Sequence, residues 1–405
     1  MRKNLLLLTL LATAFIAQAQ ITPECEANNG FNPITGEQCN NALVTAVPFL
    51  RIVPDARSGA MGDVGIAISA DANAMHFNAS KLVFAEQPVG LSATYTPWLR
   101  ALNLQDVYLA YLTGYYQLDE LQALGFGLRY FNLGTIPFTD ANGEPIGQGR
   151  PNEWELKASY ARKLSDKFSA AVGAKFIYSN LASGQMVNGE QIRAGLAGAA
   201  DISFTYLTDV ELAQESELTV GLALTNLGSK ITYTNSINRD FIPANLGLGS
   251  ALKMQLDDYN SLTFAVDINK LLVPTPPVSD PSNPGANDLN NNGVADYKEG
   301  SSIGAIFSSF GDAPLGFSEE LRELMYSVGA EYWYDEQFAV RAGYYAEHQT
   351  KGARRFFTVG LGIKYNVFGL NFSYLVPTTN QRNPLDNTLR FSLLFDFGAF
   401  DDLNN

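Results

Sequence analysis

The segment that decides the fold is Leu389-Arg390-Phe391-Ser392-Leu393-Leu394-Phe395-Asp396-Phe397, in which large apolar residues occupy every second position. A second segment, Phe356–Tyr365, repeats this pattern with Phe357, Val359, Leu361, Ile363 and Tyr365 on one side. Because successive side chains of a strand point to opposite faces, each segment is predicted to be a strand with one apolar face and one polar or small face. Strands of about ten residues with this alternation are typical of barrels that cross an outer membrane.

The alternation recurs from Val89 to the end of the chain. It predicts about 14 strands, the first at residues 89–98 and the last at residues 388–398. Connections after even-numbered strands are mostly tight, such as 163–167, whereas those after odd-numbered strands are mostly long, such as 272–323. Short periplasmic turns and long outer loops characterise this class. We therefore predict an all-β fold, an antiparallel outer-membrane β-barrel of about 14 strands over residues 88–398, with a C-terminal tail at 399–405 and both termini in the periplasm.

The chain before the barrel is predicted to have three parts. Residues 1–19 resemble a signal peptide, with Arg2 and Lys3, an apolar run at Leu5–Ile16 and a small-residue cleavage site at Ala17-Gln18-Ala19. Residues 20–47 are predicted to be a periplasmic segment, and residues 48–87 a plug in the lumen, because both lack strand alternation. A disordered leader is the alternative for residues 20–43.

Composition limits the classes of function. The net charge of −14 over 405 residues argues against a nucleic-acid partner, and 19 Tyr and 25 Phe suit aromatic girdles at the membrane interfaces. Cys25 and Cys39 are predicted to form a disulfide in an oxidising periplasm, which would contribute roughly 3 kcal/mol by closing a short loop. Two cysteines and two histidines cannot supply a zinc cluster of the usual composition.

Charged residues within the strands are predicted to face a wet lumen, where they pair with one another or with the plug. A charge facing lipid near the midplane would cost about 2–4 kcal/mol. A dedicated transport or catalytic path is the alternative. The residues concerned are Glu153, Glu155, Lys157, Asp267, Glu331, Arg341, Arg390 and Asp396.

One motif has metal-binding spacing, and it lies in the long extracellular loop at residues 272–323. Asp288, Asn290, Asn292, Val294 (by its carbonyl), Asp296 and Glu299 occupy the ligand positions of a twelve-residue calcium loop, with Gly293 at the sharp turn. Prolines precede the motif in place of a helix, so a flexible Asn/Asp/Gly loop is the alternative. If occupied, the calcium ion would stiffen the loop.

The same loop is predicted to contain a short helix at Ser318–Leu324, with Ser318 as N-cap. The chain is not predicted to be an enzyme. His76 lies in the plug and His348 near the outer end of a strand, and no serine motif accompanies either of them.

The plug carries a family resemblance. Residues 49–65 read FLRIVPDARSGAMGDVG and residues 70–82 read ADANAMHFNASKL. These stretches resemble the PorV family, outer-membrane components of the type IX secretion system. More distantly the chain resembles FadL-type barrels, which have fourteen strands around an N-terminal plug. The wider group has Asn-Pro-Ala where this chain has Asn78-Ala79-Ser80, and this departure weakens an inference of fatty-acid transport.

The resemblance implies a function and partners. PorV-like proteins receive cargo from the type IX translocon barrel, bind its C-terminal signal domain at the cell surface and deliver it to an attachment complex with a PorU-like sortase. Outer-membrane lipid is the other expected partner. No cofactor is implied, and a structural Ca²⁺ is the one candidate. By topology, loops 135–151, 228–243 and 272–323 are expected to contact translocon or cargo. The alternative is a FadL-like transporter of hydrophobic compounds, which predicts an apolar pocket near the plug.

Overall fold

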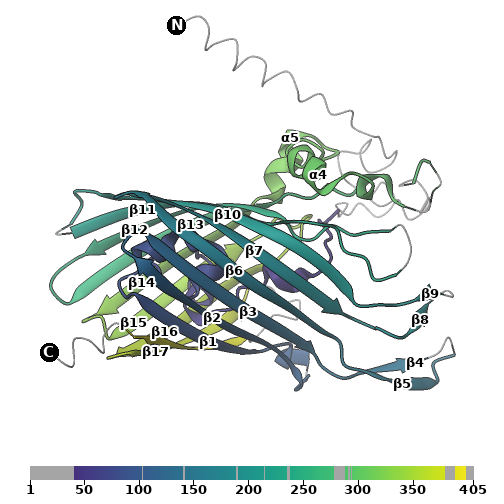
Figure 1. Cartoon of the computed structure of the whole chain (residues 1–405), viewed down its shortest axis with the longest axis horizontal. Helices are drawn as coiled ribbons and strands as arrows, with labels where there is room; N and C mark the ends of the chain where they lie inside the picture. The colour runs from purple at the N-terminus through teal and green to yellow at the C-terminus, as the bar shows by residue number, and fades with distance from the viewer. Residues whose placement is uncertain are drawn as a thin grey trace, which may run out of the picture.

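Fourteen strands close into a barrel in which every strand pairs antiparallel with both neighbours (Figure 1). The structure is a computed structural model, and it describes residues 41–102, 104–139, 142–187, 190–213, 215–234, 238–277, 288–290, 292, 294–378 and 388–397. The ring closes where β1 (Val89–Pro97) pairs with β18 (Leu389–Asp396), with Gly90 opposite Asp396 and Tyr95 opposite Phe391. The predicted fold class and strand number are confirmed.

The remaining barrel strands follow the predicted segments to within a few residues. They are β2 (Val107–Asp119), β3 (Gln122–Leu133), β6 (Asn152–Ser165), β7 (Phe168–Asn180), β10 (Gly195–Asp209), β11 (Glu215–Gly228), β12 (Asn245–Gln255), β13 (Asn260–Leu271), β14 (Met325–Tyr334), β15 (Phe338–Ala346), β16 (Arg355–Tyr365) and β17 (Phe368–Pro377). Two small hairpins in long loops were not predicted: β4 (Ile136–Thr139) with β5 (Pro145–Gly149), and β8 (Met186–Val187) with β9 (Glu190–Gln191).

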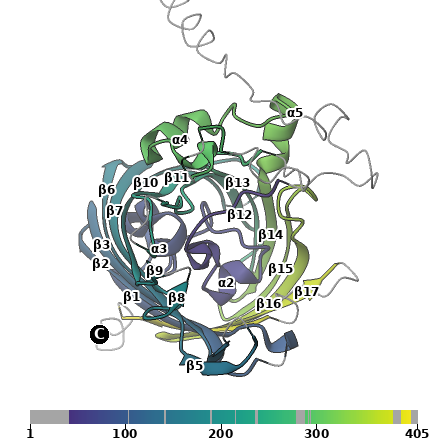
Figure 2. The ribbon, with the colours of Figure 1, turned by 90° about the vertical axis from the view of Figure 1, so that its right-hand side faces the viewer.

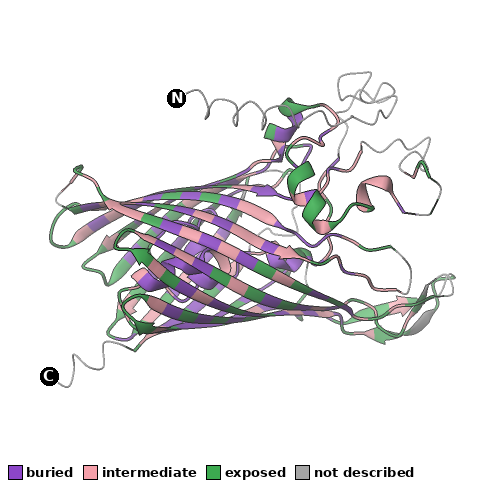
Figure 3. Cartoon of the chain, turned by 45° about the horizontal axis from the view of Figure 1, so that its top comes forward, coloured by how far each residue is buried: buried purple, intermediate pink, exposed green. Residues whose placement is uncertain are grey.

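Burial alternates along each strand as the sequence pattern requires (Figure 3). In β16, Phe357, Val359, Leu361 and Ile363 are exposed on the outer wall, while the residues between them are buried. Exposed aromatic side chains also gather where the short turns lie, at Tyr116, Tyr206, Tyr259, Tyr334, Phe338, Tyr365 and Phe368. An apolar outer wall bounded by aromatic residues suits a lipid bilayer and its interface.

The two ends of the barrel differ in their connections. Tight turns join β2 to β3, β6 to β7, β12 to β13, β14 to β15 and β16 to β17, and this is the short-turn end. The opposite, long-loop end carries the small hairpins and the loop after β13, with η4 (Asp296–Lys298), α4 (Ser302–Ser308), α5 (Phe317–Glu320) and η5 (Leu321–Glu323). The loop after β1 adds η3 (Arg100–Leu102). In barrels of this class the long loops are usually the outer ones.

The helix predicted at Ser318–Leu324 begins one residue earlier, at Phe317, and continues as η5. The prediction of Ser318 as N-cap was wrong, because Gly316 holds the cap position in a left-handed conformation with φ of 73°. The helix α4 was not predicted. Its N-cap is Ser301, whose hydroxyl accepts a hydrogen bond from the Gly304 N–H at 3.0 Å. Among the described residues, no helix is long and apolar enough to cross a membrane.

Residues 48–87 lie inside the ring of strands, and we call them the luminal segment (Figure 2). Its short helices are η1 (Pro48–Arg51), α2 (Ala56–Gly59), α3 (Ala74–Phe77) and η2 (Ala79–Phe84). Asp55 caps α2 by accepting a hydrogen bond from the Ser58 N–H at 2.8 Å. The segment starts near the long-loop end and reaches the short-turn end, where β1 begins at Val89.

Residues 41–47 are the described part of the segment predicted to be periplasmic, and they lie at the long-loop end. The Asn41 amide donates to the Pro276 carbonyl at 3.2 Å, and the Ala46 N–H donates to the Phe241 carbonyl at 2.9 Å. Both partners belong to long loops, so these residues are on the opposite side from the one predicted. The reason is that the luminal segment passes through the whole barrel before β1 starts. Residues 1–40 and 398–405, including Cys25 and Cys39, lie outside the described residues.

Candidate functional site

The luminal segment is bound to the barrel wall by a buried ionic group. Glu331 of β14 accepts hydrogen bonds from Arg57 of the segment at 2.7 and 2.9 Å and from Arg341 of β15 at 2.6 Å. Glu331 and Arg341 are each 1% exposed. Paired charges of this kind stabilise only as a complete set, because removing one partner leaves the others buried and unpaired. This group therefore fixes the segment to one side of the ring.

Four of the other inward charges that the sequence analysis identified are paired with charged groups or with the luminal segment, as predicted, whereas Glu153 is bonded to a wall hydroxyl and Asp396 borders a cavity. Arg390 of β18 lies 3.6 Å from Asp63 of the luminal segment, and Glu155 lies 3.4 Å from Arg129. Asp267 of β13 accepts hydrogen bonds from the Gly65 and Ile66 N–H groups at 2.7 and 2.9 Å. Lys157 contacts Asp201 at 2.5 Å, and Glu153 accepts a hydrogen bond from Ser179 at 2.6 Å.

The luminal segment approaches the wall most closely at Met61-Gly62. Gly62 has φ of 70°, and its N–H donates to Thr358 Oγ1 at 2.7 Å. A Cβ added to Gly343 of β15 would lie 2.0 Å from the Met61 carbonyl carbon and 2.1 Å from the Gly62 nitrogen. Backbone packs on backbone here, so only glycine is tolerated at both positions.

The departure from the Asn-Pro-Ala pattern has a local role. The Asn78 side chain caps η2 by accepting a hydrogen bond from the Ser80 N–H at 3.1 Å. It also donates to Thr205 Oγ1 of β10 at 2.9 Å, while the Ser80 hydroxyl lies 2.7 Å from the same oxygen. Ser80 therefore adds a contact with the wall that an alanine could not make.

Two cavities lie beside the luminal segment in the described structure, and they share no lining residue. The first, of about 110 Å³, is bordered by Arg51, Asp63, Asp267 and Arg354 among others. The second, of about 130 Å³, lies nearer the short-turn end beside Glu86 and Asp396. Both are smaller than the roughly 300–1,000 Å³ usual for small-molecule pockets, and each has charged side chains among the residues that border it.

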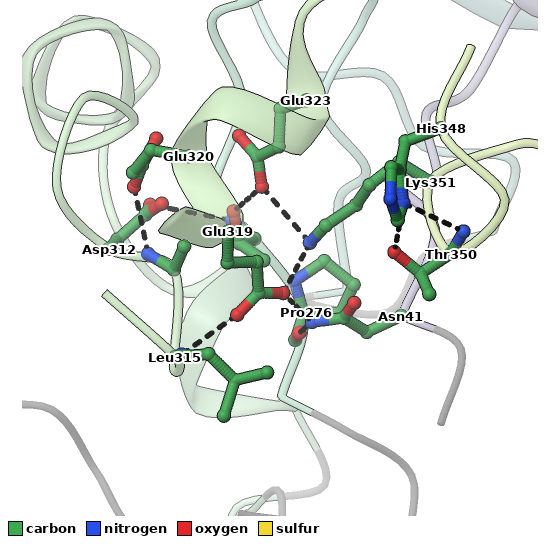
Figure 4. Close-up of polar contacts among 12 residues, drawn as sticks. Asn41, Pro276, Asp312, Leu315, Glu319, Glu320, Glu323, His348, Thr350 and Lys351 are labelled. Atoms are coloured by element: carbon green, nitrogen blue, oxygen red, sulfur yellow. Dashed lines mark hydrogen bonds and ion pairs between the residues drawn. The ribbon is translucent and has the colours of Figure 1, made fainter. Parts of the chain in front are cut away.

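Two loops, the end of β13 and Asn41 meet in a buried group of charges at the long-loop end, which we call the outer charge cluster (Figure 4). Lys351 contacts Glu319 at 2.6 Å and Glu323 at 3.1 Å. Lys270 contacts Glu320 at 2.9 Å and Glu323 at 2.5 Å. Asn41 donates to Glu319 at 2.6 Å, so residues 41–47 are tied to the same cluster.

The carboxylates of this region are in different protonation environments. Burial would raise the pKa of Glu319, but hydrogen bonds from Lys351 and from the Leu315 N–H hold that pKa below its ordinary value. Burial raises the pKa of Asp312 to about 7, and the nearby Glu320 and Glu323 add to this rise. Hydrogen bonding from Thr275 offsets the rise only in part. Asp312 therefore takes up a proton near neutral pH.

The candidate calcium loop brings most of its predicted ligands together. The Asn292 N–H donates to Asp288 Oδ1 at 3.1 Å, and the Val294 N–H donates to Asn292 Oδ1 at 2.8 Å. The amides of Asn290 and Asn292 both donate to Glu299 Oε1, the former at 2.8 Å, and these bonds lower the pKa of Glu299.

The predicted metal ligands of this loop are all oxygen atoms, which calcium prefers. Asp296 Oδ1 is buried without a hydrogen-bond partner. In the part of the chain that the structure describes, no three His, Cys, Asp or Glu side chains are placed together to hold a metal ion, and this includes Asp288, Asp296 and Glu299. The loop is fixed to its neighbour by Lys298, which contacts Asp240 at 2.7 Å.

Neither histidine is placed beside a serine nucleophile in the described structure. His76 Nδ1 lies 2.5 Å from an Arg129 nitrogen, inside the lumen. His348 Nδ1 lies 2.9 Å from Thr350 Oγ1 at the barrel rim. Both contacts are those of histidines held within polar networks.

These features define an outer-membrane β-barrel whose lumen is occupied by a segment of its own chain. The family model described as "Type IX secretion system protein PorV" matches residues 35–278, which is more than half of the chain. The chain therefore belongs to the PorV family of the type IX secretion system.

Comparison with solved structures returns outer-membrane barrels, all at low identity. The Ralstonia pickettii toluene transporter TbuX is 13% identical with a TM-score of 0.45, covering 84% of this chain and 97% of its own. A TodX monoaromatic hydrocarbon channel variant is 12% identical with a TM-score of 0.48, covering 85% and 99%. A Pseudomonas aeruginosa FadL homologue is 10% identical with a TM-score of 0.41, covering 88% and 100%. No curated protein matches the chain.

Proposed function

We propose that this protein is a non-enzymatic adaptor of type IX secretion. It receives cargo at the translocon barrel, binds the cargo's C-terminal signal domain at the cell surface, and passes the cargo to a PorU-like sortase complex. Membership of the PorV family supports the pathway. The long-loop end faces outward and the short-turn end faces the periplasm in this proposal, as is usual for such barrels.

An occupied lumen is shared with FadL-type barrels, so the observation that favours an adaptor over a transporter is how firmly the segment is held and how little space is left around it. The luminal segment is bonded to the neighbouring strands β13 and β14 through Asp267 and Glu331, and to β18, four strands further round the ring, through Arg390. The cavities that remain are small and bordered by charged side chains. A hydrophobic compound would have to displace these ion pairs to pass, which makes the FadL-like alternative the weaker one.

The described parts of three long loops supply the docking elements in this proposal. The hairpin β4–β5 extends beyond the ring of strands (Figure 1), and the loop after β13 is held on the rim by the outer charge cluster. An adaptor needs surfaces that stay in one arrangement, because ordering a loop on binding weakens affinity. The buried lysine–glutamate contacts provide that preorganisation.

Deleting the gene and comparing the released, surface and periplasmic proteomes tests the proposal. Proteins with type IX C-terminal signals should leave the surface fraction, and either accumulate inside or be released with the signal uncut. Complementation with a chain whose residues 135–151 are replaced by a Gly/Ser linker should restore assembly of the barrel but not cargo attachment. Unchanged secretion together with reduced uptake of a hydrophobic compound would instead establish the transporter.

A further inference from the structure

The loop after β13 carries a group of exposed apolar side chains that its role at the rim does not explain. We call them the loop foot: Ile303 and Phe307 of α4, Phe310, Phe317 of α5, and Leu321. Their exposures are 70%, 70%, 42%, 76% and 49%. Ile303 and Phe307 are four residues apart and therefore share one face of α4. So many large exposed apolar side chains in one short stretch indicate a contact with something other than water.

Phe310, Phe317 and Leu321 of the foot lie beside the outer wall of the barrel. The helix α4 is anchored at the rim, where its Ala305 belongs to the same buried cluster as Phe241 and Met325. Figure 2 shows α4 and α5 outside the ring of strands, next to β10, β11 and β13. One contact that holds α5 there is made by Lys270, which follows the exposed Ile268 on the outer face of β13. Its ammonium group lies between Glu320 and Glu323 at 2.9 and 2.5 Å, so the acidic helix covers the last outward position of this strand.

A groove of about 190 Å³ separates the foot from the wall. Its wall side is formed by Leu246, Leu248 and Ile268, of which Leu248 and Ile268 are directly opposite in the β12–β13 register. Its loop side is formed by Phe310, Phe317, Leu321 and Leu324. Nearly all of this lining is aliphatic or aromatic, and the charged groups at its edge are already paired with each other.

The groove is continuous with the lipid-facing belt. Leu248 and Ile268 are exposed, and below them on β13 the outward residues Val266 and Phe264 are exposed as well. A bilayer that covers Phe264 and Val266 therefore also reaches the mouth of the groove. Water at this depth would be in contact with an almost wholly apolar surface, whereas a lipid chain would lose no polar contacts on entering.

We propose that the loop foot rests in the outer leaflet and that the groove binds an acyl chain of an outer-leaflet lipid. The loop is then attached at two levels: its polar side to the rim through the outer charge cluster, and its apolar side to the membrane. Short amphipathic elements with aromatic and aliphatic residues on one side commonly lie at a bilayer interface in this way. The proposal depends on the barrel spanning the membrane with its long-loop end outward, and it is independent of the secretion role.

Depth-dependent fluorescence quenching in vesicles tests whether the loop foot lies among lipid acyl chains. The full chain is reconstituted in phosphatidylcholine vesicles with or without bromine on the acyl chains, as Phe317→Trp, Phe264→Trp and Ile136→Trp variants. Phe264 lies on the lipid-facing wall, whereas Ile136 is exposed in the hairpin β4–β5 beyond the ring. The chain has three tryptophans of its own. The wild-type fluorescence is therefore subtracted from that of each variant, and the remaining signals of the three variants are compared.

Quenching of the Phe317→Trp signal by brominated chains, to an extent close to that of Phe264→Trp, is the expected result. A Phe317→Trp signal that is quenched no more than that of Ile136→Trp would overturn the proposal. Quenching by aqueous iodide is measured in the same variant. If the introduced tryptophan of Phe317→Trp is protected from iodide in native outer membranes but not in vesicles, a protein partner covers the foot, and lipid binding is rejected.

Discussion

Replacing Glu331 by glutamine should loosen the luminal segment without changing the shape of the wall. The carboxylate of Glu331 accepts three hydrogen bonds from Arg57 and Arg341 within 2.9 Å. Glutamine keeps the volume but removes the negative charge, so both guanidinium groups lose their shared anion. Arg57 retains Asp71 at 3.2 Å, and Arg341 retains Asn371 at 2.8 Å.

The expected magnitude follows from burial. Removing one partner of a buried ion pair costs about 3–5 kcal/mol. Because Arg57 still has Asp71 nearby, we expect the lower end, about 3 kcal/mol in the free energy of docking of the luminal segment. A difference of this size raises the population of the undocked segment roughly a hundredfold.

Electrical recording in planar bilayers measures that population. Purified wild-type protein should remain closed for most of the recording, whereas Glu331→Gln should open often enough to be counted. The matched control is Asp209→Asn, which removes an exposed ion pair with Lys167 at 3.9 Å and should change nothing measurable. Equal opening frequencies and equal thermal stability in Glu331→Gln and wild type would refute the view that this group holds the segment in place.

Three further predictions concern the wall contact and the long loop. Gly343→Ala should displace the luminal segment and raise conductance, because its Cβ would meet backbone at 2.0 Å, whereas Gly198→Ala, with a nearest atom at 4.0 Å, should not. Millimolar Ca²⁺ should slow proteolysis of residues 272–323 in the wild type but not in Glu299→Gln, because the variant lacks the last carboxylate ligand. Attachment of the same loop should weaken as the pH rises from about 4 to about 7. Burial raises the pKa of Asp312 from 3.8 to about 7. Within this pH range the attached loop therefore keeps a proton on Asp312 that the released loop loses, and each rise in pH favours release. Asp312→Asn should remove this pH dependence when proteolysis is measured across that range.

Specific outcomes would contradict these three predictions. Equal conductance of the two glycine variants would mean that the segment adjusts at no cost. Calcium protection that persists in Glu299→Gln, or that is absent from the wild type, would reject the calcium loop, and Glu211→Gln in a short turn is the control. A loop whose proteolysis is already independent of pH in the wild type would show that Asp312 ionises without affecting attachment.

The alternation of residues in the sequence predicted most of the barrel, because strand formation in such a wall depends on a local property. Each outward position must be apolar, and each inward position must be small, polar or paired. In β16 this rule places Thr358 inside and Val359 outside, as the sequence pattern requires. The inward charges were also correctly assigned to the lumen. The sequence could not specify that Glu331 would form ion pairs with both Arg57 and Arg341.

The regions that the sequence analysis placed incorrectly or missed are those fixed by contacts between distant parts of the chain. Asn41 and Glu319 are separated by 278 residues, and their hydrogen bond helps place residues 41–47 at the long-loop end, opposite to the prediction. The outward position of the loop foot depends in the same way on Lys270 and its two glutamates.

The sequence by itself determined an antiparallel barrel of 14 strands, its apolar outer face and the difference between its two ends, because a period of two is set residue by residue along each strand. Only the tertiary structure decided the path of the luminal segment, the position of residues 41–47 and the side of the wall on which the long loop lies. These features result from buried charges that are stable only when their partners from other loops and strands are present, and no local pattern encodes which partners will meet.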